Sequence, residues 1–167
     1  ASRAAMKREA PQFLFELTGE AMYWTRSAED TAAFGEALGA LLRPGDSVLI
    51  SGDLGAGKSV MARGIARALG VKGPMPSPTF TLMQPYGKVC HFDLYRLSDE
   101  DEFYAAGLDE FLGGEYIALV EWPFDGMDAA PCAMAHIARG QGEDERIVRL
   151  SFEGMAGRAA QIKGALG

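Results

Sequence analysis

The chain has 167 residues, of which 48% are hydrophobic and 23% charged, and its formal net charge at pH 7 is −7. This length suits one domain with one sizeable core, which we expect over residues 13–167. The acidic excess argues against direct, stable binding of tRNA or DNA by the chain alone, because nucleic-acid-binding proteins usually carry a basic face.

The first half of the chain predicts strands and helices in alternation. Residues 1–12 are expected to be a remnant of recombinant expression followed by a disordered N-terminus. Ser27 is a good helix N-cap, and Asp30 stands three residues later, as in a capping box. We expect two short strands over residues 13–17 and 21–25, followed by the capped helix over 27–42. A buried strand over 47–51 and a second helix with one apolar stripe over 61–69 complete this half.

The second half predicts hairpins. Three prolines make residues 72–80 a loop. Ser98 is expected to cap a third helix, whose acidic first turn the helix dipole favours. Two strands are expected on the two sides of a turn at residues 86–88, and another strand over 115–122. A hairpin is expected over 133–139 and 146–152, followed by a short final helix.

Cysteine usage and hydropathy predict a cytoplasmic protein. Cys90 and Cys132 do not form a CxxC pair, and the two histidines are isolated in sequence, so the spacing of zinc ligands is missing. We therefore expect two reduced, structural thiols. The apolar runs of the sequence are also much shorter than a membrane span.

The sequence GDLGAGKS, residues 52–59, matches the P-loop (Walker A) pattern G-x-x-x-x-G-K-[ST], between a predicted strand and a predicted helix. Glycines allow successive backbone N–H groups to converge on phosphate oxygens, and the start of a helix favours anions. We expect Lys58 to lie between the β- and γ-phosphates of a nucleotide, and the Ser59 hydroxyl to bind Mg²⁺.

Two acidic residues follow apolar runs, Asp93 after VCHF and Glu121 after IALV. A P-loop needs an acid near its metal ion, usually at the end of a buried strand. Either residue fits that role, and for either alone a solvated carboxylate at a strand end is the alternative explanation. Their presence together in a chain with a P-loop favours the functional interpretation.

Two further residues are candidates for the same site. Thr79 stands where the proline-rich loop meets a strand, so its hydroxyl is a candidate sensor of the γ-phosphate, or simply a threonine at a strand start. Trp122 follows Glu121 directly and either orients this acid or belongs to the core.

Strands that alternate with helices early and form hairpins late predict a mixed sheet. Combined with the P-loop, this gives the predicted fold class: α/β, a P-loop NTPase-like three-layer sandwich with a mixed, partly antiparallel central sheet. The four motifs GDLGAGKS, SPTFTL, HFDLYRL and VEWP, in this order, resemble the TsaE family, formerly called YjeE. They extend from about residue 27 to residue 146, whereas the stretch before Gly19 has no clear counterpart in the family.

The resemblance implies a weak, Mg²⁺-dependent ATPase that works in a complex with two other proteins, TsaB and TsaD, in the threonylcarbamoyladenosine modification of adenosine 37 in tRNA. It also implies roles for single residues. Ser59 and Glu121 would bind Mg²⁺, Asp93 would help to position water or metal, Thr79 would act as a switch, and Trp122 would shape the site. The phosphates would be held by Leu54, Gly55, Ala56, Gly57, Lys58 and Ser59.

Three other functions are weighed against this one. A small-molecule P-loop kinase needs an acceptor pocket and commonly an arginine-bearing lid, and Arg96 is the only arginine between the helix after the P-loop and the last hairpin. A GTPase commonly recognises guanine through Asn-Lys-x-Asp, and the chain contains no asparagine. A nucleotide-gated interaction module, whose hydrolysis is incidental, differs mainly in that it would tolerate loss of Glu121.

Overall fold

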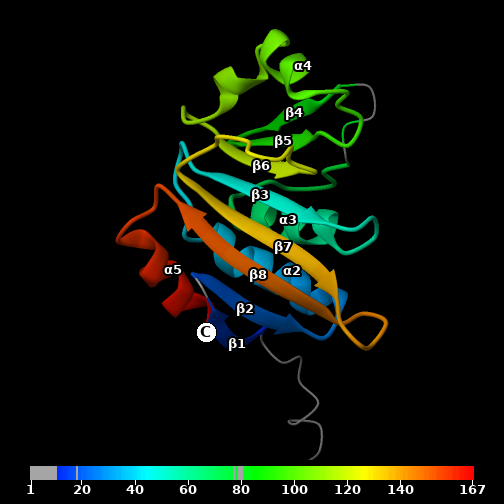
Figure 1. Cartoon of the computed structure of the whole chain (residues 1–167), viewed down its shortest axis with the longest axis vertical. Coiled ribbons are helices and arrows are strands. Elements are labelled where there is room, and N and C mark those ends of the chain that lie inside the picture. The colour runs from blue at the N-terminus through cyan, green and yellow to red at the C-terminus, as the bar shows by residue number, and fades with distance from the viewer. Residues whose placement is uncertain (1–10, 18, 77, 79–80) are drawn as a thin grey trace, which may run out of the picture.

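The computed structural model describes residues 11–17, 19–76, 78 and 81–167 (Figure 1). Most of the N-terminal segment expected over 1–12 therefore lies outside the described residues. The strands are β1 (Gln12–Leu17), β2 (Glu20–Thr25), β3 (Ser47–Gly52), β4 (Met83–Tyr86), β5 (Val89–Asp93), β6 (Ile117–Glu121), β7 (Cys132–Arg139) and β8 (Arg146–Glu153). The helices are α2 (Ala28–Gly39), α3 (Lys58–Ala68), α4 (Glu100–Ala105), the 3-10 helix η1 (Leu108–Phe111) and α5 (Arg158–Leu166).

These strands form one sheet in the order β1-β2-β8-β7-β3-β6-β5-β4. Its centre is parallel, because β3 pairs with both β6 and β7, and β5 pairs with β6. Both flanks are antiparallel. The predicted mixed sheet is confirmed, and the C-terminal ends of β3, β5 and β6 meet at one edge, where ligands of α/β proteins usually bind.

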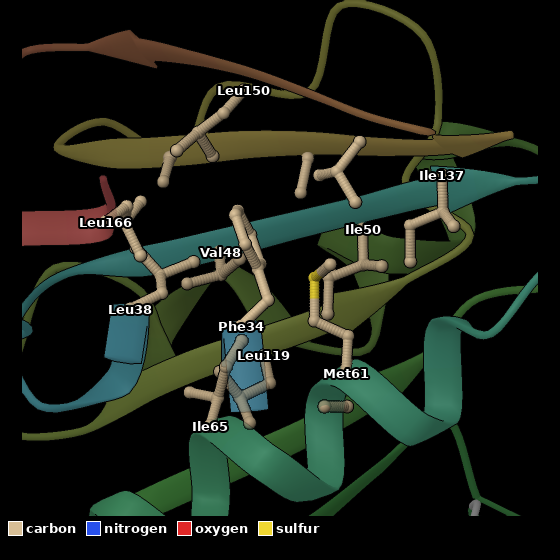
Figure 2. Close-up of a cluster of buried hydrophobic side chains, with 14 of the residues drawn as sticks. Phe34, Leu38, Val48, Ile50, Met61, Ile65, Leu119, Ile137, Leu150 and Leu166 are labelled. Carbon is tan, nitrogen blue, oxygen red and sulfur yellow. The ribbon is translucent and has the colours of Figure 1, made fainter. Parts of the chain in front are cut away.

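Helices α2, α3 and α5 cover one face of the sheet. Figure 2 shows how the side chains of this layer meet those of β3, with Met61 and Ile65 of α3 directed towards the sheet. A second cluster lies on the opposite face, where Phe103 of α4 packs with Phe92 of β5 and Val120 of β6. The predicted three-layer sandwich is confirmed, although the layer of α4 and η1 lies only over the β5–β6 side.

Of the two helix N-cap residues predicted from the sequence, one is confirmed. The Ser27 hydroxyl accepts a hydrogen bond from the Asp30 N–H at 3.0 Å and caps α2 as expected. The prediction of Ser98 as the cap of α4 is wrong by one residue, because the Asp99 carboxylate accepts the Glu102 N–H at 3.1 Å. Glu102 in turn accepts the N–H of Ser98 at 3.0 Å, so Asp99 and Glu102 together satisfy backbone N–H groups at the start of the helix.

Both cysteines are free and buried, as expected for structural thiols. Burial raises the pKa of Cys90 to about 11 and is also the main cause that raises the pKa of Cys132 to about 11. Both thiols are therefore protonated and unreactive near neutral pH. Among the helices of the described residues, none is long and apolar enough to cross a membrane.

Helices α2 and α3 approach each other closely through glycines. A Cβ atom on Gly64 of α3 would lie 2.2 Å from the carbonyl oxygen of Ala32 in α2. A Cβ atom on Gly35 of α2 would lie 2.4 Å from the carbonyl oxygen of Met61. Because α3 begins at the P-loop, this packing also fixes the position of the loop.

We predict that Gly64→Ala destabilises the fold by about 1–3 kcal/mol, because the added methyl group separates the two helices. The matched control is Gly164→Ala in α5, where a Cβ atom meets nothing within 4 Å. Alanine has the higher helix propensity, so this control is expected to gain up to about 1 kcal/mol. Urea unfolding of both variants measures the difference, and equal effects would contradict the close packing.

Candidate functional site

The P-loop connects β3 to α3 at the C-terminal edge of the parallel strands. Gly52 has φ +144°, and a Cβ atom there would lie 2.3 Å from the carbonyl oxygen of Ile137 in β7, so only glycine fits. Gly57, with φ +112°, is the N-cap of α3 and has no side chain to cap it. The first N–H groups of α3 therefore lack both helical partners and a capping side chain, which is the arrangement that binds anions.

Lys58 is 5% exposed, and its ammonium group lies against the loop. Its Nζ donates to the carbonyl oxygens of Gly52 at 2.8 Å and Asp53 at 2.6 Å. Burial lowers the pKa of Lys58, and the nearby carboxylates of Glu121, Asp53 and Asp93 oppose this by raising it. The site therefore holds a partly desolvated cation beside several carboxylates.

The two predicted acids lie side by side at the ends of neighbouring strands. Asp93 of β5 and Glu121 of β6 are partners in the parallel register. Glu121 is 2% exposed, and its Oε1 accepts a hydrogen bond from the Ser59 hydroxyl at 2.9 Å. The structure thus brings the hydroxyl at the start of α3 into contact with the acid at the end of β6.

Trp122 lies beside the acids in an unusual backbone conformation. Its φ is +58°, which costs a residue other than glycine about 1 kcal/mol or more. Its N–H donates to the carbonyl oxygen of Ile50 at 3.1 Å, and the ring centroid lies 4.1 Å from Lys58 Nζ and 4.7 Å from that of Tyr95. Trp122 is partly buried at the site and does not belong to either core cluster.

Most of the predicted residues surround one cavity of about 350 Å³, lined by Leu54, Gly55, Gly57, Lys58, Ser59, Val60, Asp93, Glu121 and Trp122. Ala56, within the loop, is fully buried and does not line the cavity. Thr79 lies outside the described residues.

A larger cavity, of about 610 Å³, lies at the opposite end of α3 and includes Arg63, Arg67 and Lys72 in its lining. It adjoins the negative end of the helix dipole, where cationic side chains are favoured without any ligand. Arg67 lies 3.6 Å from the Glu36 carboxylate, an ordinary exposed ion pair. Chemistry, not volume, therefore identifies the smaller cavity as the candidate site.

Two arginines of the β7–β8 hairpin contact the P-loop, and the sequence did not reveal them as site residues. Arg146 Nε donates to the carbonyl oxygen of Ala56 at 2.6 Å, while its Nη1 donates to those of Glu143 and Glu145, both at 2.8 Å. Arg139, the cross-strand partner of Arg146, donates to the carbonyl oxygen of Gly55 at 3.2 Å. Arg146 thus ties the hairpin turn to the P-loop.

The same turn helps to form a small cavity of about 40 Å³ on another side of the P-loop. Its lining includes Ala28 and Thr31 of α2, Gly57 of the loop, and Asp144 and Arg146 of the hairpin. The start of α2 and the turn between β7 and β8 therefore line the same small cavity. The structure places both beside Gly57.

Within the described part of the chain, groups of three or more histidine, cysteine, aspartate and glutamate side chains suited to hold a metal ion are absent. Ser59 and Glu121 nevertheless offer oxygen atoms, the donors that Mg²⁺ prefers. Magnesium commonly binds proteins through one or two such groups together with phosphate oxygens and water. These residues therefore fit a metal ion that arrives with a nucleotide.

The model of the family described as "Threonylcarbamoyl adenosine biosynthesis protein TsaE" matches residues 25–148. The chain belongs to the TsaE family. Members of this family take part in tRNA threonylcarbamoyladenosine biosynthesis, and the resemblance seen in the four motifs is confirmed. The match begins at the end of β2, in agreement with the missing counterpart before Gly19.

Similar proteins agree with this assignment. The "tRNA threonylcarbamoyladenosine biosynthesis protein TsaE" of Bacillus subtilis (strain 168) is 36% identical over 135 residues, which is 78% of this chain and 84% of the relative. The protein of the same name from Mycobacterium tuberculosis (strain ATCC 25618 / H37Rv) is 38% identical over 134 residues, 72% of this chain and 79% of the relative. The crystal structure of Bacillus subtilis YdiB matches with a TM-score of 0.66 and 27% identity, and covers 90% of this chain and 96% of that chain.

We predict that Arg146→Ala loosens the P-loop. The variant loses the charged donor to Ala56, and such hydrogen bonds contribute about 1.5–3 kcal/mol, so exchange of the amide hydrogens of residues 53–57 should become about tenfold faster or more. Hydrogen exchange followed by mass spectrometry measures this. Arg149→Ala on the same strand, which removes only a surface pair with Glu20 at 3.8 Å, is the control and should leave those amides unchanged.

Proposed function

We propose that the chain is a Mg²⁺-dependent, ATP-binding and weakly ATP-hydrolysing subunit that is required for threonylcarbamoyladenosine modification of tRNA adenosine 37, in a complex with TsaB and TsaD. The observation that carries the proposal is the contact between the Ser59 hydroxyl and the Glu121 carboxylate at the cavity that Lys58 also lines. A hydroxyl at a helix start beside a strand-end acid is the arrangement that holds Mg²⁺ in P-loop enzymes.

The P-loop would hold the phosphates through backbone groups of Leu54 to Ser59. The N–H groups at the start of α3 provide donors, and the helix dipole adds a favourable field for anions. Lys58 supplies the positive charge, and it gives up little hydration on binding because burial has already removed most of its water.

Ser59 and Glu121 would hold Mg²⁺, which would neutralise charge that develops on the transferred phosphoryl group. Asp93, beside Glu121, would orient the attacking water. Thr79 remains a proposed switch residue on sequence grounds alone. Trp122 would close one wall of the phosphate site, where its ring already contacts the Lys58 ammonium group.

The acidic charge of the chain supports a division of labour with TsaB and TsaD. Proteins that bind tRNA directly rely on basic surfaces to contact phosphates. With a net charge of −7, this chain is better suited to act through protein partners that hold the tRNA. Its nucleotide cycle would then support turnover of the complex, and not the transfer chemistry itself.

A small-molecule P-loop kinase is the alternative. The position of Arg139 and Arg146 beside the P-loop favours a kinase, because kinases commonly have a lid whose arginines close over the phosphates. Here both side chains donate to carbonyl oxygens of the loop, which gives them a structural role in the P-loop. The kinase requires a second substrate, and this requirement separates it from an ATPase.

We predict that Lys58→Ala lowers the affinity for Mg²⁺·ATP by about 100-fold, because the charged contact to the phosphates is lost. Titration calorimetry with and without Mg²⁺ measures the change. Lys88→Ala, in the exposed turn between β4 and β5, removes the same charge elsewhere and should bind like the wild type. Unchanged affinity in Lys58→Ala would count against the phosphate-binding role of the loop.

We also predict that TsaB and TsaD together raise the rate of phosphate release from ATP by this chain, and that Glu121→Gln abolishes the stimulated rate without loss of folding. Steady-state phosphate release, with a thermal melt of each variant, checks both statements. Absence of stimulation would favour the kinase. Full support of tRNA modification by Glu121→Gln would favour an interaction module whose hydrolysis is incidental.

A further inference from the structure

His91 lies in the core directly behind the candidate metal site. It is 1% exposed on β5, two residues before Asp93, on the face of the sheet that α3 covers. Its Nε2 lies 2.6 Å from Oε2 of Glu121, while Oε1 of the same carboxylate accepts the hydrogen bond from Ser59. His91, Glu121 and Ser59 thus form a chain of polar contacts from β5 through β6 to α3, in which each carboxylate oxygen of Glu121 has one partner.

The surroundings of the imidazole ring decide which nitrogen carries the proton. Nδ1 of His91 is buried, and it makes no hydrogen bond with the described residues. A buried N–H without an acceptor costs more than a bare lone pair, because the strong donor loses its water. The proton therefore lies on Nε2, which donates to Oε2 of Glu121.

A carboxylate that is 2% exposed has almost no water to hold it in one orientation, so it depends on fixed hydrogen-bond partners. Ser59 provides one such partner at Oε1, the oxygen on the side of the proposed metal position. The bond to His91 is independent of the metal, since it uses the oxygen on the far side of the carboxylate.

We propose that His91 is a positioning residue of this site: it holds one oxygen of Glu121 so that the other faces Ser59 and the metal position. Histidine residues and carboxylates behind a metal ligand orient it, and their loss typically lowers metal affinity or activity 10- to 100-fold. The role in metal binding rests on the proposed Mg²⁺·ATP function, whereas the hydrogen bond to Glu121 does not.

The first experiment compares His91→Leu, which removes the donor, with His91→Gln, whose amide nitrogen can still donate to Glu121. Calorimetry measures ATP affinity with Mg²⁺ and with EDTA. In His91→Leu the gain in affinity that Mg²⁺ provides should fall about tenfold or more, while affinity in EDTA stays unchanged. In His91→Gln most of the gain should remain.

A merely structural role for His91 gives a different pattern, with ATP affinity falling equally in EDTA and in Mg²⁺. That result, or a wild-type gain in His91→Leu, overturns the proposal. A second cycle uses Glu121→Gln, in which the further change His91→Leu should have little additional effect on the Mg²⁺-dependent gain. Additive effects would show that His91 does not act through Glu121.

The second experiment needs no nucleotide and no stable variant at position 91. Long-range ¹H–¹⁵N spectra of the wild-type protein should show one histidine with a protonated Nε2 and a bare Nδ1. The chain has two histidines, so the spectrum of His136→Gln assigns the signal. The opposite tautomer overturns the proposal even if Mg²⁺·ATP binds. If the predicted tautomer is found but ATP binding does not depend on Mg²⁺, the proposed function is refuted together with the metal role of His91.

Discussion

The hydrogen bond between Ser59 and Glu121 joins the start of α3 to the end of β6, and the rest of the site depends on it. The length of this hydrogen bond depends on how α3 packs against the sheet. Ile50 of β3 lies beside Glu121 in the parallel register, and β3 continues to Gly52 before the P-loop turns back into α3. The apolar face of α3 then lies against the sheet in the core shown in Figure 2. A shift of α3 along the sheet would therefore separate the hydroxyl from the acid.

Charge balance explains why this arrangement is tolerated inside the protein. Glu121 is nearly inaccessible to water, and a buried carboxylate without partners is costly. Ser59 and His91 supply hydrogen bonds, and the Lys58 ammonium group supplies the opposite charge nearby. The strained backbone of Trp122 is likewise held by several contacts. Its N–H donates to the carbonyl oxygen of Ile50, and its ring contacts Lys58 and Tyr95. Each costly feature is fixed by contacts from more than one element.

The sequence predicted the parts of the site that local pattern determines. The P-loop was evident because glycine spacing and the flanking strand and helix are local, and Asp93 and Glu121 were evident because each ends an apolar strand. The contacts of His91, Arg139 and Arg146 could not be predicted in this way. They depend on which strands are neighbours and in which register, and Arg146 reaches Ala56 across 90 positions of the chain. The misplaced cap of α4 has a local cause, since Ser98 and Asp99 are adjacent and both suit the role.

The mixed topology of the sheet has a consequence for the site that a purely parallel sheet would not have. After β7 the chain returns through a tight hairpin as the antiparallel strand β8, and not through a helix on the face of the sheet. The turn of this hairpin therefore lies at the same edge as the P-loop (Figure 1). A turn presents carbonyl oxygens and charged side chains at close range, and Arg146 uses both, binding turn carbonyls and the Ala56 carbonyl through one guanidinium group. The antiparallel half of the sheet thus supports the P-loop that the parallel half positions.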